Sequence, residues 1–151
     1  MKKGGFTLIE LLITGALVVL AVAVIVSSFS SFSKNQGLGN TADMILTAIG
    51  EARSKTLSSE GSNQFGVHFA SSSATVFSGI VYDAASATNI VYKFPLSSEV
   101  SLLSLSGGGS DVVFQKITGK TDQYGSVTIR LKSNIATTEV ININNSGIPS
   151  I

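Results

Sequence analysis

The chain contains no cysteine and a single histidine among its 151 residues. The absence of cysteine excludes a disulfide framework, a thiol nucleophile and a thiolate metal site, and it leaves the redox compartment undetermined. His68 has no second imidazole with which to share a metal ion, and a lone histidine on a strand is typically a surface or half-buried residue. We therefore expect neither a metal site nor a cofactor.

Charged residues are also scarce. Only 13% of the residues are charged, and ten basic side chains stand against nine acidic ones. Beyond residue 30 the basic residues are interleaved with acids and form no dense run. Because nucleic-acid binding relies on a clustered basic patch that neutralises phosphates, this pattern disfavours a nucleic-acid partner.

Serine is abundant, but none of the serines has the strand-turn-helix context of a Gly-x-Ser-x-Gly nucleophile. The serines fall in segments rich in Gly, Thr and Asn, which are typical of loops and turns. The sequence thus offers no catalytic residue, and we expect the protein not to be an enzyme.

The apolar residues are concentrated before residue 30, where 6–29 carries a single charge, Glu10. At a rise of about 1.5 Å per residue, this stretch can cross a hydrocarbon core of about 30 Å. It lacks the short apolar core and small-residue cleavage site of a secretory signal, so we expect it to remain as an anchor. Lys2 and Lys3 favour a cytoplasmic N-terminus with the rest of the chain outside.

Glu10 is unusual, because a carboxylate near the start of an apolar span costs a few kcal/mol. One interpretation is that Glu10 lies shallow enough to reach the headgroups. The other is that it pairs with a cation once chains pack side by side, since an unpaired charge is costly in a low dielectric.

The N-terminal residues resemble a known motif, the prepilin cleavage and methylation site of type IV pilins and type II secretion pseudopilins. The resemblance lies in a short basic leader, Gly before the cut, Phe after it and Glu as the fifth mature residue: Lys2-Lys3-Gly4-Gly5, then Phe6-Thr7-Leu8-Ile9-Glu10-Leu11-Leu12-Ile13. It implies that a prepilin peptidase/N-methyltransferase removes leader 1–5 by cutting between Gly5 and Phe6 and then methylates Phe6. This chain would be the substrate.

The resemblance also implies partners and a location. Glu10 would pair with the N-terminus of a neighbouring Phe6 and so set the register of subunits in a filament core. Other pilin or pseudopilin subunits would be bound through the N-terminal helices, with an inner-membrane assembly platform as a further partner. The chain would cross the inner membrane once, with its C-terminal domain outside the cytoplasm, before joining a filament. Helix packing in the filament core would be helped by four small residues: Gly15, Ala16, Ala21 and Ala23.

A Ser- and Gly-rich stretch, 27–40, follows the anchor and reads as a flexible joint. The next apolar residues recur at spacings of three and four and so share one helical face: Leu38, Ala42, Ile45, Ile49 and Ala52. We predict an amphipathic helix within 30–60, capped by Asn40 or Thr41 and ended by Gly61.

Segment 61–151 alternates apolar and polar residues in short runs separated by turns. In the first run His68 falls opposite the face of Phe65, Val67 and Phe69. Strands are predicted at 65–69, around 76–77, at 90–92, 100–105, 112–117, 127–131 and 140–143. A long N-terminal helix followed by these strands predicts an α+β fold, with the second half of the helix packed on a small antiparallel β-sheet domain.

The second half also resembles one branch of the family, the minor pseudopilins of the general secretion pathway protein H type and the minor pilins called FimT. The matching segments are short apolar and Gly patterns: 46–54, a strand near Val67, Gly125-Ser126-Val127-Thr128-Ile129, and Ile141-Asn142-Ile143 before Gly147. This branch implies a structural minor subunit of a type II secretion pseudopilus or a type IV pilus. The alternative is a DNA- or surface-binding minor pilin for DNA uptake or adhesion. Segment 144–151 contains no cation, which weighs against DNA uptake.

Three further residues in the sheet domain and helix have alternative interpretations. Asp122, with Asp111, could supply oxygens to a Ca²⁺ ion, but the spaced acids of a calcium loop are missing, so a plain turn is favoured. Arg53 either points to the sheet edge or a neighbouring subunit, or is a solvated residue that pairs with a nearby acid.

Overall fold

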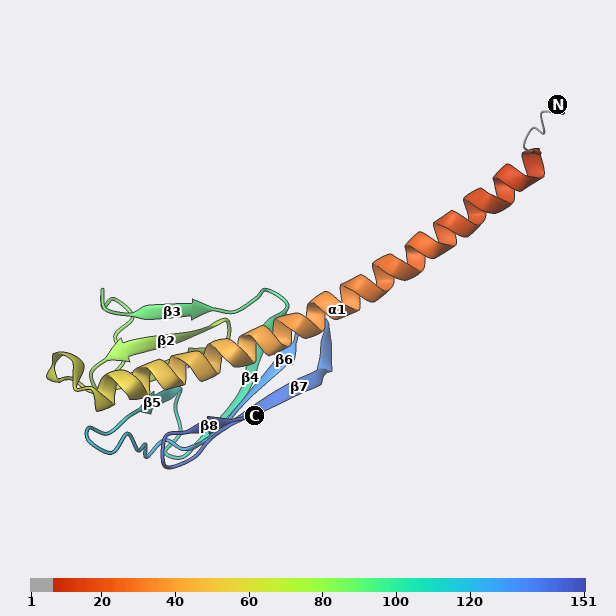
Figure 1. The fold of residues 1–151 in the computed structure, drawn as a ribbon. Coiled ribbons are helices and arrows are strands. Elements are labelled where there is room, and N and C mark those ends of the chain that lie inside the picture. Colours follow the sequence, from red (N-terminus) through yellow and green to blue (C-terminus); the bar gives the residue numbers. More distant parts are fainter. Residues whose placement is uncertain (1–6) are drawn as a thin grey trace. The chain divides into compact units, whose positions relative to one another are not determined.

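The computed structural model describes residues 7–151, without the side chains of residues 27–31 and 33–35. Within this range a long helix, α1 (Leu8–Leu57), precedes a single 3-10 turn, η1 (Glu60–Ser62), and a series of strands (Figure 1). The strands are β1 (Phe65–Ala70), β2 (Ser73–Ser78), β3 (Ile90–Lys93), β4 (Ser98–Leu105), β5 (Asp111–Val113), β6 (Gly125–Leu131), β7 (Asn134–Ile143) and β8 (Pro149–Ser150).

The chain divides into two compact units, Met1–Lys34 and Asn35–Ile151. We call the second the head unit. The boundary falls within the Ser- and Gly-rich stretch 27–40, whose backbone is helical and belongs to α1. The flexibility expected of this stretch stays a prediction. The head unit therefore includes the last part of α1 as well as every strand.

The strands of the head unit form two four-stranded antiparallel sheets, with the orders β3-β2-β1-β5 and β4-β6-β7-β8. The predicted α+β class is confirmed, although the domain has two sheets rather than one. A backbone hydrogen bond from Val100 N–H of β4 to Ser71 O of the β1–β2 turn, at 2.9 Å, joins the two sheets.

The core of the head unit lies between the sheets and the C-terminal part of α1. The apolar helical face predicted from the spacing of residues 38–52 is buried, and Ile45 and Ile49 are fully enclosed. They pack in one cluster with Val67 of the first sheet and Ile129 of the second. Burying each such side chain contributes about 1.5–3 kcal/mol. The helix thus ties both sheets together.

The predicted ends of the second helix are wrong. Asn40 and Thr41 lie inside α1, and the buried Thr41 hydroxyl donates to Gly37 O at 2.9 Å instead of capping a helix start. The helix ends at Leu57, before Gly61, which adopts φ +58 in the 3-10 turn. Because α1 continues upstream, the N–H groups that Asn40 or Thr41 would have capped already have helical partners.

The strand predictions hold with three differences. β5 stops at Val113, and Ile117 lies in a turn rather than in the predicted strand 112–117. β7 begins at Asn134, upstream of the predicted 140–143, and β8 was not predicted. Val76 joins the core cluster while Phe77 is buried on the other side of β2, edge-on to the Tyr82 ring, so these two side chains take opposite faces as predicted.

Candidate functional site

The most distinctive surface is the N-terminal part of α1. Over Leu8–Val26 the mean hydropathy is 2.8, and no part of this segment is buried by the rest of the protein. We call Leu8–Val26 the anchor segment. A helix of this length and composition can cross a membrane. Its exposed Leu, Ile and Val side chains are in an unfavourable environment in water, so this surface needs lipid or other helices to cover it.

The predicted cleavage site, Gly5 and Phe6, lies outside the described residues. Glu10 is described, and it lies in the first turn of α1. Thr7 precedes the helix, and its hydroxyl accepts a hydrogen bond from Glu10 N–H at 3.3 Å. Thr7 is therefore the N-cap, and Glu10 occupies the third helical position, where a carboxylate is favoured by the helix dipole.

Thr7 and Glu10 have the Thr-x-x-Glu spacing of a capping box, a local signal that the sequence-based predictions above do not include. It gives Glu10 a second, local role beside the predicted pairing between subunits. Thr14 forms a further hydrogen bond near the helix start, in which its hydroxyl donates to Glu10 O at 2.8 Å. Satisfying the polar groups of a helix end matters most where water is scarce.

The four small residues predicted to assist helix packing do not form one stripe. At roughly 100° per residue, Ala16 and Ala23 lie within about 20° of each other around α1, with Gly15 about 100° away from Ala16. Ala21 projects from another side of the helix. Nothing lies within 4 Å of a Cβ placed on Gly15, so a close approach is open there. The face of Ala16 and Ala23 is the best candidate for helix packing, and its use stays a prediction.

In the head unit, His68 is not isolated. Its Nδ1 lies 2.6 Å from Asp111 Oδ1, across the β1–β5 pair in which these residues are opposite one another. Its ring stacks on Tyr82 with centroids 3.9 Å apart. The half-buried position on the face opposite Phe65, Val67 and Phe69 was predicted, whereas the Asp111 and Tyr82 partners were not. Together these contacts link β1, β5 and the loop after β2.

The two aspartates considered for a Ca²⁺ ion have separate partners. Asp111 faces His68, while Asp122 Oδ2 accepts from Gln115 Nε2 at 2.9 Å. Among residues 7–151 no group of three His, Asp or Glu side chains is placed to hold a metal ion. Asp122 thus braces the turn that precedes β6.

Arg53 points to the turn before β6. Its Nε donates to Gly119 O at 3.2 Å, and the side chain is half-buried. Of the alternatives from the sequence, this geometry corresponds to an Arg directed at the sheets rather than to one that pairs with an acid. The contact fixes the end of α1 to the turn.

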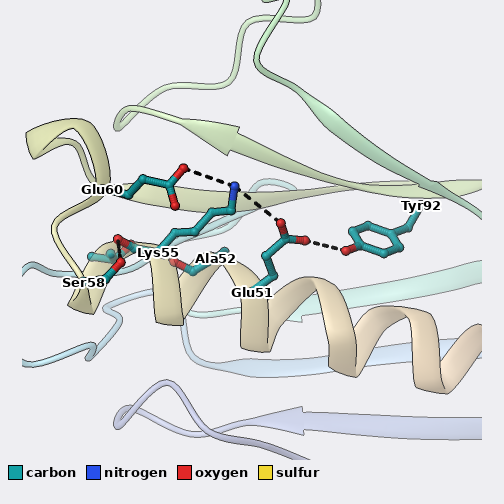
Figure 2. A network of polar contacts seen from close by, with 7 residues as sticks. Glu51, Ala52, Lys55, Ser58, Glu60 and Tyr92 are labelled. Atoms are coloured by element: carbon teal, nitrogen blue, oxygen red, sulfur yellow. Dashed lines mark hydrogen bonds and ion pairs between the residues drawn. The ribbon is translucent and has the colours of Figure 1, made fainter.

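A polar network fastens the end of α1 to β3 and to the 3-10 turn (Figure 2). Lys55 Nζ lies 3.5 Å from both Glu51 Oε1 and Glu60 Oε1. The Tyr92 hydroxyl donates a short hydrogen bond to Glu51 Oε2. This bond, partial burial and the charge of Glu51 together raise the pKa of Tyr92 above its usual value of 10.0. Glu51 and Lys55 are four residues apart on α1, whereas Tyr92 follows Glu51 by 41 residues, so no local pattern indicated the bond between Tyr92 and Glu51.

The head unit also has a shallow hollow where the two sheets meet. Its volume is about 300 Å³, near the lower limit for small-molecule sites. Its lining contains apolar groups and Ser hydroxyls but no charged side chain: Phe69, Ala70, Ser71, Val100, Ser101, Leu102, Leu103 and Ser110. Such a lining offers no general acid, base or metal ligand, so it does not resemble a catalytic site.

Comparison with protein-family models, with curated proteins and with solved structures gives no match.

Proposed function

We propose that this protein is a structural subunit of the prepilin class, a minor pilin or pseudopilin that a prepilin peptidase cuts between Gly5 and Phe6 before filament assembly. It inserts once into the inner membrane with the head unit outside the cytoplasm, and it then joins a type II secretion pseudopilus or a type IV pilus. It acts as the peptidase's substrate and not as an enzyme.

The observation that carries the proposal is the exposed anchor segment joined to a head unit with its own core. Among the side chains that the structure describes, the buried core residues lie between Leu38 and Ile143, and none of them belongs to the anchor segment. A subunit that is held by lipid and then packed against other helices needs this division. Other anchored proteins can share this division. The predicted cut between Gly5 and Phe6, together with Glu10, is what favours the prepilin class.

The position of Glu10 within the apolar anchor segment supports a role in assembly. It is the only charged residue in the anchor segment. In a filament core made of such helices, a carboxylate is tolerated when a cation contacts it. The methylated amino group of a neighbouring Phe6 would supply that cation. Because the helix can relieve the cost of the unpaired charge by placing Glu10 near the headgroups before assembly, the two interpretations describe successive states.

The charges of the head unit favour a structural role over nucleic-acid binding. Lys55 contacts two glutamates, and Arg130 NH2 lies 2.7 Å from Glu99 Oε1. Arg53 and Lys116 donate to backbone carbonyls, those of Gly119 and Ser62. These cations are already engaged within the protein, which leaves few to neutralise phosphates.

Mass spectrometry tests the cut directly. In its host, the membrane-extracted protein is expected to begin at a methylated Phe6 when the prepilin peptidase is active, and at Met1 when the peptidase gene is deleted. Retention of 1–5 in the presence of an active peptidase would refute the proposal. Gly5→Val is the matched variant, expected to block cleavage while leaving membrane insertion unchanged.

Assembly is tested with Glu10→Ala. We expect this variant to insert as well as the natural chain, because it removes a charge from an apolar span. Its incorporation into sheared filaments is expected to fall at least tenfold. Val19→Ala, an equally exposed change in the same segment, is the control and should assemble normally. Normal incorporation of Glu10→Ala would argue against the pairing role.

A further inference from the structure

Two large apolar side chains project into solvent on neighbouring loops of the head unit. Leu96, between β3 and β4, is 92% exposed, and Ile135, at the start of β7, is 68% exposed. Lys132 N–H donates to Ser97 O at 2.9 Å, which holds the β6–β7 turn against the β3–β4 loop. We call Leu96, Ile135 and the exposed Lys93 and Lys132 the Leu96 surface.

The exposure of Ile135 follows from an irregular register. Leu131 pairs with Asn134, whereas the preceding Arg130 pairs with Thr138. Residues 135–137 therefore have no partner on β6 and bulge from the strand pair. A bulge of this kind re-aims a side chain, here an isoleucine that the core does not use.

The β3–β4 loop, which carries Leu96, lies beside α1 (Figure 1). Gly37 of α1 is buried, and a Cβ added to it would meet Ser97 Oγ at 2.3 Å, so the helix backbone packs directly on the β3–β4 loop. The neighbouring Thr41 hydroxyl lies 2.5 Å from Ser98 Oγ. These contacts fix the loop of Leu96 to the helix that leads towards the anchor segment.

The chain length places this surface within reach of a membrane. If Glu10 is kept out of the hydrocarbon, the next 20 residues or so cross a core of about 30 Å, which ends near Ser30. Gly37 is seven positions after Ser30, a rise of about 10 Å in helical form. The headgroup layer itself extends about 5–7 Å beyond the core.

The charges of the Leu96 surface also suit a membrane as its partner. Lys93 and Lys132 are exposed, and each cation close to an anionic membrane favours binding by about 1 kcal/mol, or about fivefold. The acid nearest to Leu96 in sequence, Glu99, is engaged by Arg130 at 2.7 Å. Exposed aliphatic groups flanked by lysines form the arrangement that enters a headgroup layer.

We infer that the Leu96 surface docks on the outer face of the membrane, with Leu96 and Ile135 inserted among the headgroups of anionic lipids, before the subunit is taken into a filament. The inference rests on the membrane anchoring in the proposed function but not on the prepilin cut. Docking would hold the head against the lipid and limit its encounters with other head units until assembly lifts it away.

Tryptophan quenching tests the docking, because the chain has no tryptophan of its own. Leu96→Trp, Ile135→Trp, Ile117→Trp and Val19→Trp are made singly in the full chain and reconstituted in vesicles of phosphatidylcholine and phosphatidylglycerol. The phosphatidylcholine carries bromine near the carboxyl end of its acyl chains in one set of vesicles and near their methyl end in a second set. Quenching in the first set reports contact with the upper part of the hydrocarbon, and quenching in the second set reports contact with its centre, where Val19 is expected to lie.

Leu96→Trp and Ile135→Trp are expected to lose roughly half of their emission, as a side chain at the headgroup boundary would. Ile117→Trp should be unaffected. Ile117 is as exposed as Leu96, at 90%, but it lies in the turn bound by Arg53, about 24 Å along α1 from Gly37. Replacing Lys132 by Ser should lower the docking equilibrium constant about fivefold, and omitting phosphatidylglycerol, which removes the attraction of both lysines, should lower it about 25-fold.

The controls separate two kinds of failure. Quenching of Val19→Trp without quenching at positions 96 and 135 would overturn the docking and leave the anchoring intact. Lack of quenching at position 19 would refute the anchoring and the docking together. Equal quenching at positions 96 and 117 would show non-specific adsorption of the head, and it would also overturn the inference.

Discussion

The Tyr92 hydroxyl donates a hydrogen bond to the Glu51 carboxylate, and this bond joins the edge strand β3 to the last turns of α1. Within its sheet, β3 is an edge strand that pairs with β2. The same carboxylate faces Lys55, which also contacts Glu60 in the turn after the helix (Figure 2). One helix residue thus organises contacts to both neighbouring elements.

This relationship predicts a specific response to alkaline pH. The raised pKa of Tyr92 means that the folded state favours the neutral phenol. The bond therefore stabilises the fold fully below the ordinary tyrosine pKa of about 10, and the stabilisation is lost as the pH rises through the higher folded value. Tyr92→Phe should cost about 1 kcal/mol at neutral pH.

Urea denaturation of the head unit measures the effect, since that unit contains the whole core. At neutral pH Tyr92→Phe should unfold at lower urea concentration than the natural sequence. As the pH rises past the raised pKa of Tyr92, the difference between the two should shrink towards zero. Tyr124→Phe, at a tyrosine that is 46% exposed, is the control and should change the free energy of unfolding at neutral pH by less than about 0.5 kcal/mol. A constant difference across this range would contradict the assignment.

Ile117 predicts a stabilising substitution. Its φ is +71, and Thr118 N–H donates to Lys116 O at 2.8 Å, so Ile117 is the centre of a strained γ-turn. A β-branched residue in this conformation costs about 1–3 kcal/mol, of which glycine would recover most after its own entropic cost of about 0.5–1 kcal/mol. Ile117→Gly should therefore stabilise the head unit by about 1 kcal/mol.

The measurement is the same urea denaturation, with Ile117→Val as the control. Valine is also β-branched and should leave the free energy of unfolding nearly unchanged, because the side chain is 90% exposed and contributes no core packing. If Ile117→Gly lowered stability instead, the turn would not be strained in solution.

The buried Thr56 hydroxyl accepts a backbone hydrogen bond, and removing this acceptor is predicted to lower the stability of the head unit. Its hydroxyl accepts from Phe65 N–H at 2.9 Å at the start of β1 and donates to Ala52 O at 2.8 Å within α1. Thr56→Val keeps the shape but leaves the Phe65 N–H buried without its acceptor, a cost of about 1–3 kcal/mol. Thr47→Val, on the exposed side of the same helix, should change the free energy of unfolding by less than about 0.5 kcal/mol. Equal effects of the two variants would mean that the hydrogen bond is not responsible.

The sequence predicted those elements whose signal is periodic. The spacing of Ile45, Ile49 and Ala52 predicted the buried helix face, and the alternation of Val127, Ile129 and Leu131 predicted β6. A short segment with one apolar residue, such as β8, carries no such signal. The predicted strand 112–117 was too long because Ile117 has high strand propensity, yet local backbone hydrogen bonds, such as that from Thr118 N–H to Lys116 O, hold it in a turn.

The features of the candidate site were likewise predictable only in part from the sequence. The single charge in the anchor segment and its apolar length were visible in the sequence, because both depend on composition alone. The division into two sheets was not, since strand order depends on contacts between distant residues such as Val100 and Ser71. The bulge that exposes Ile135 likewise depends on how Leu131 and Asn134 pair across a turn. Local patterns do not encode these registers.

The roles of Glu10 in capping and in assembly can be separated, because they use different atoms. Capping uses the Glu10 N–H, which donates to Thr7 Oγ1 at 3.3 Å, whereas pairing between subunits would use the carboxylate. Glu10→Gln keeps the backbone donor and removes the charge. Thr7→Val keeps the charge and removes the cap acceptor, at a cost of about 1 kcal/mol to the helix start.

If the carboxylate sets subunit register, Glu10→Gln should reduce incorporation into filaments at least tenfold, while Thr7→Val should reduce it less than about twofold, as a cap worth about 1 kcal/mol frays only the first turn. Quantitative immunoblotting of sheared filaments against membrane-bound protein gives both values, with processed chain measured in parallel. If the reverse order were found, Glu10 would act chiefly by fixing the start of α1. A charged carboxylate would then be retained for the helix dipole rather than for a neighbouring amine.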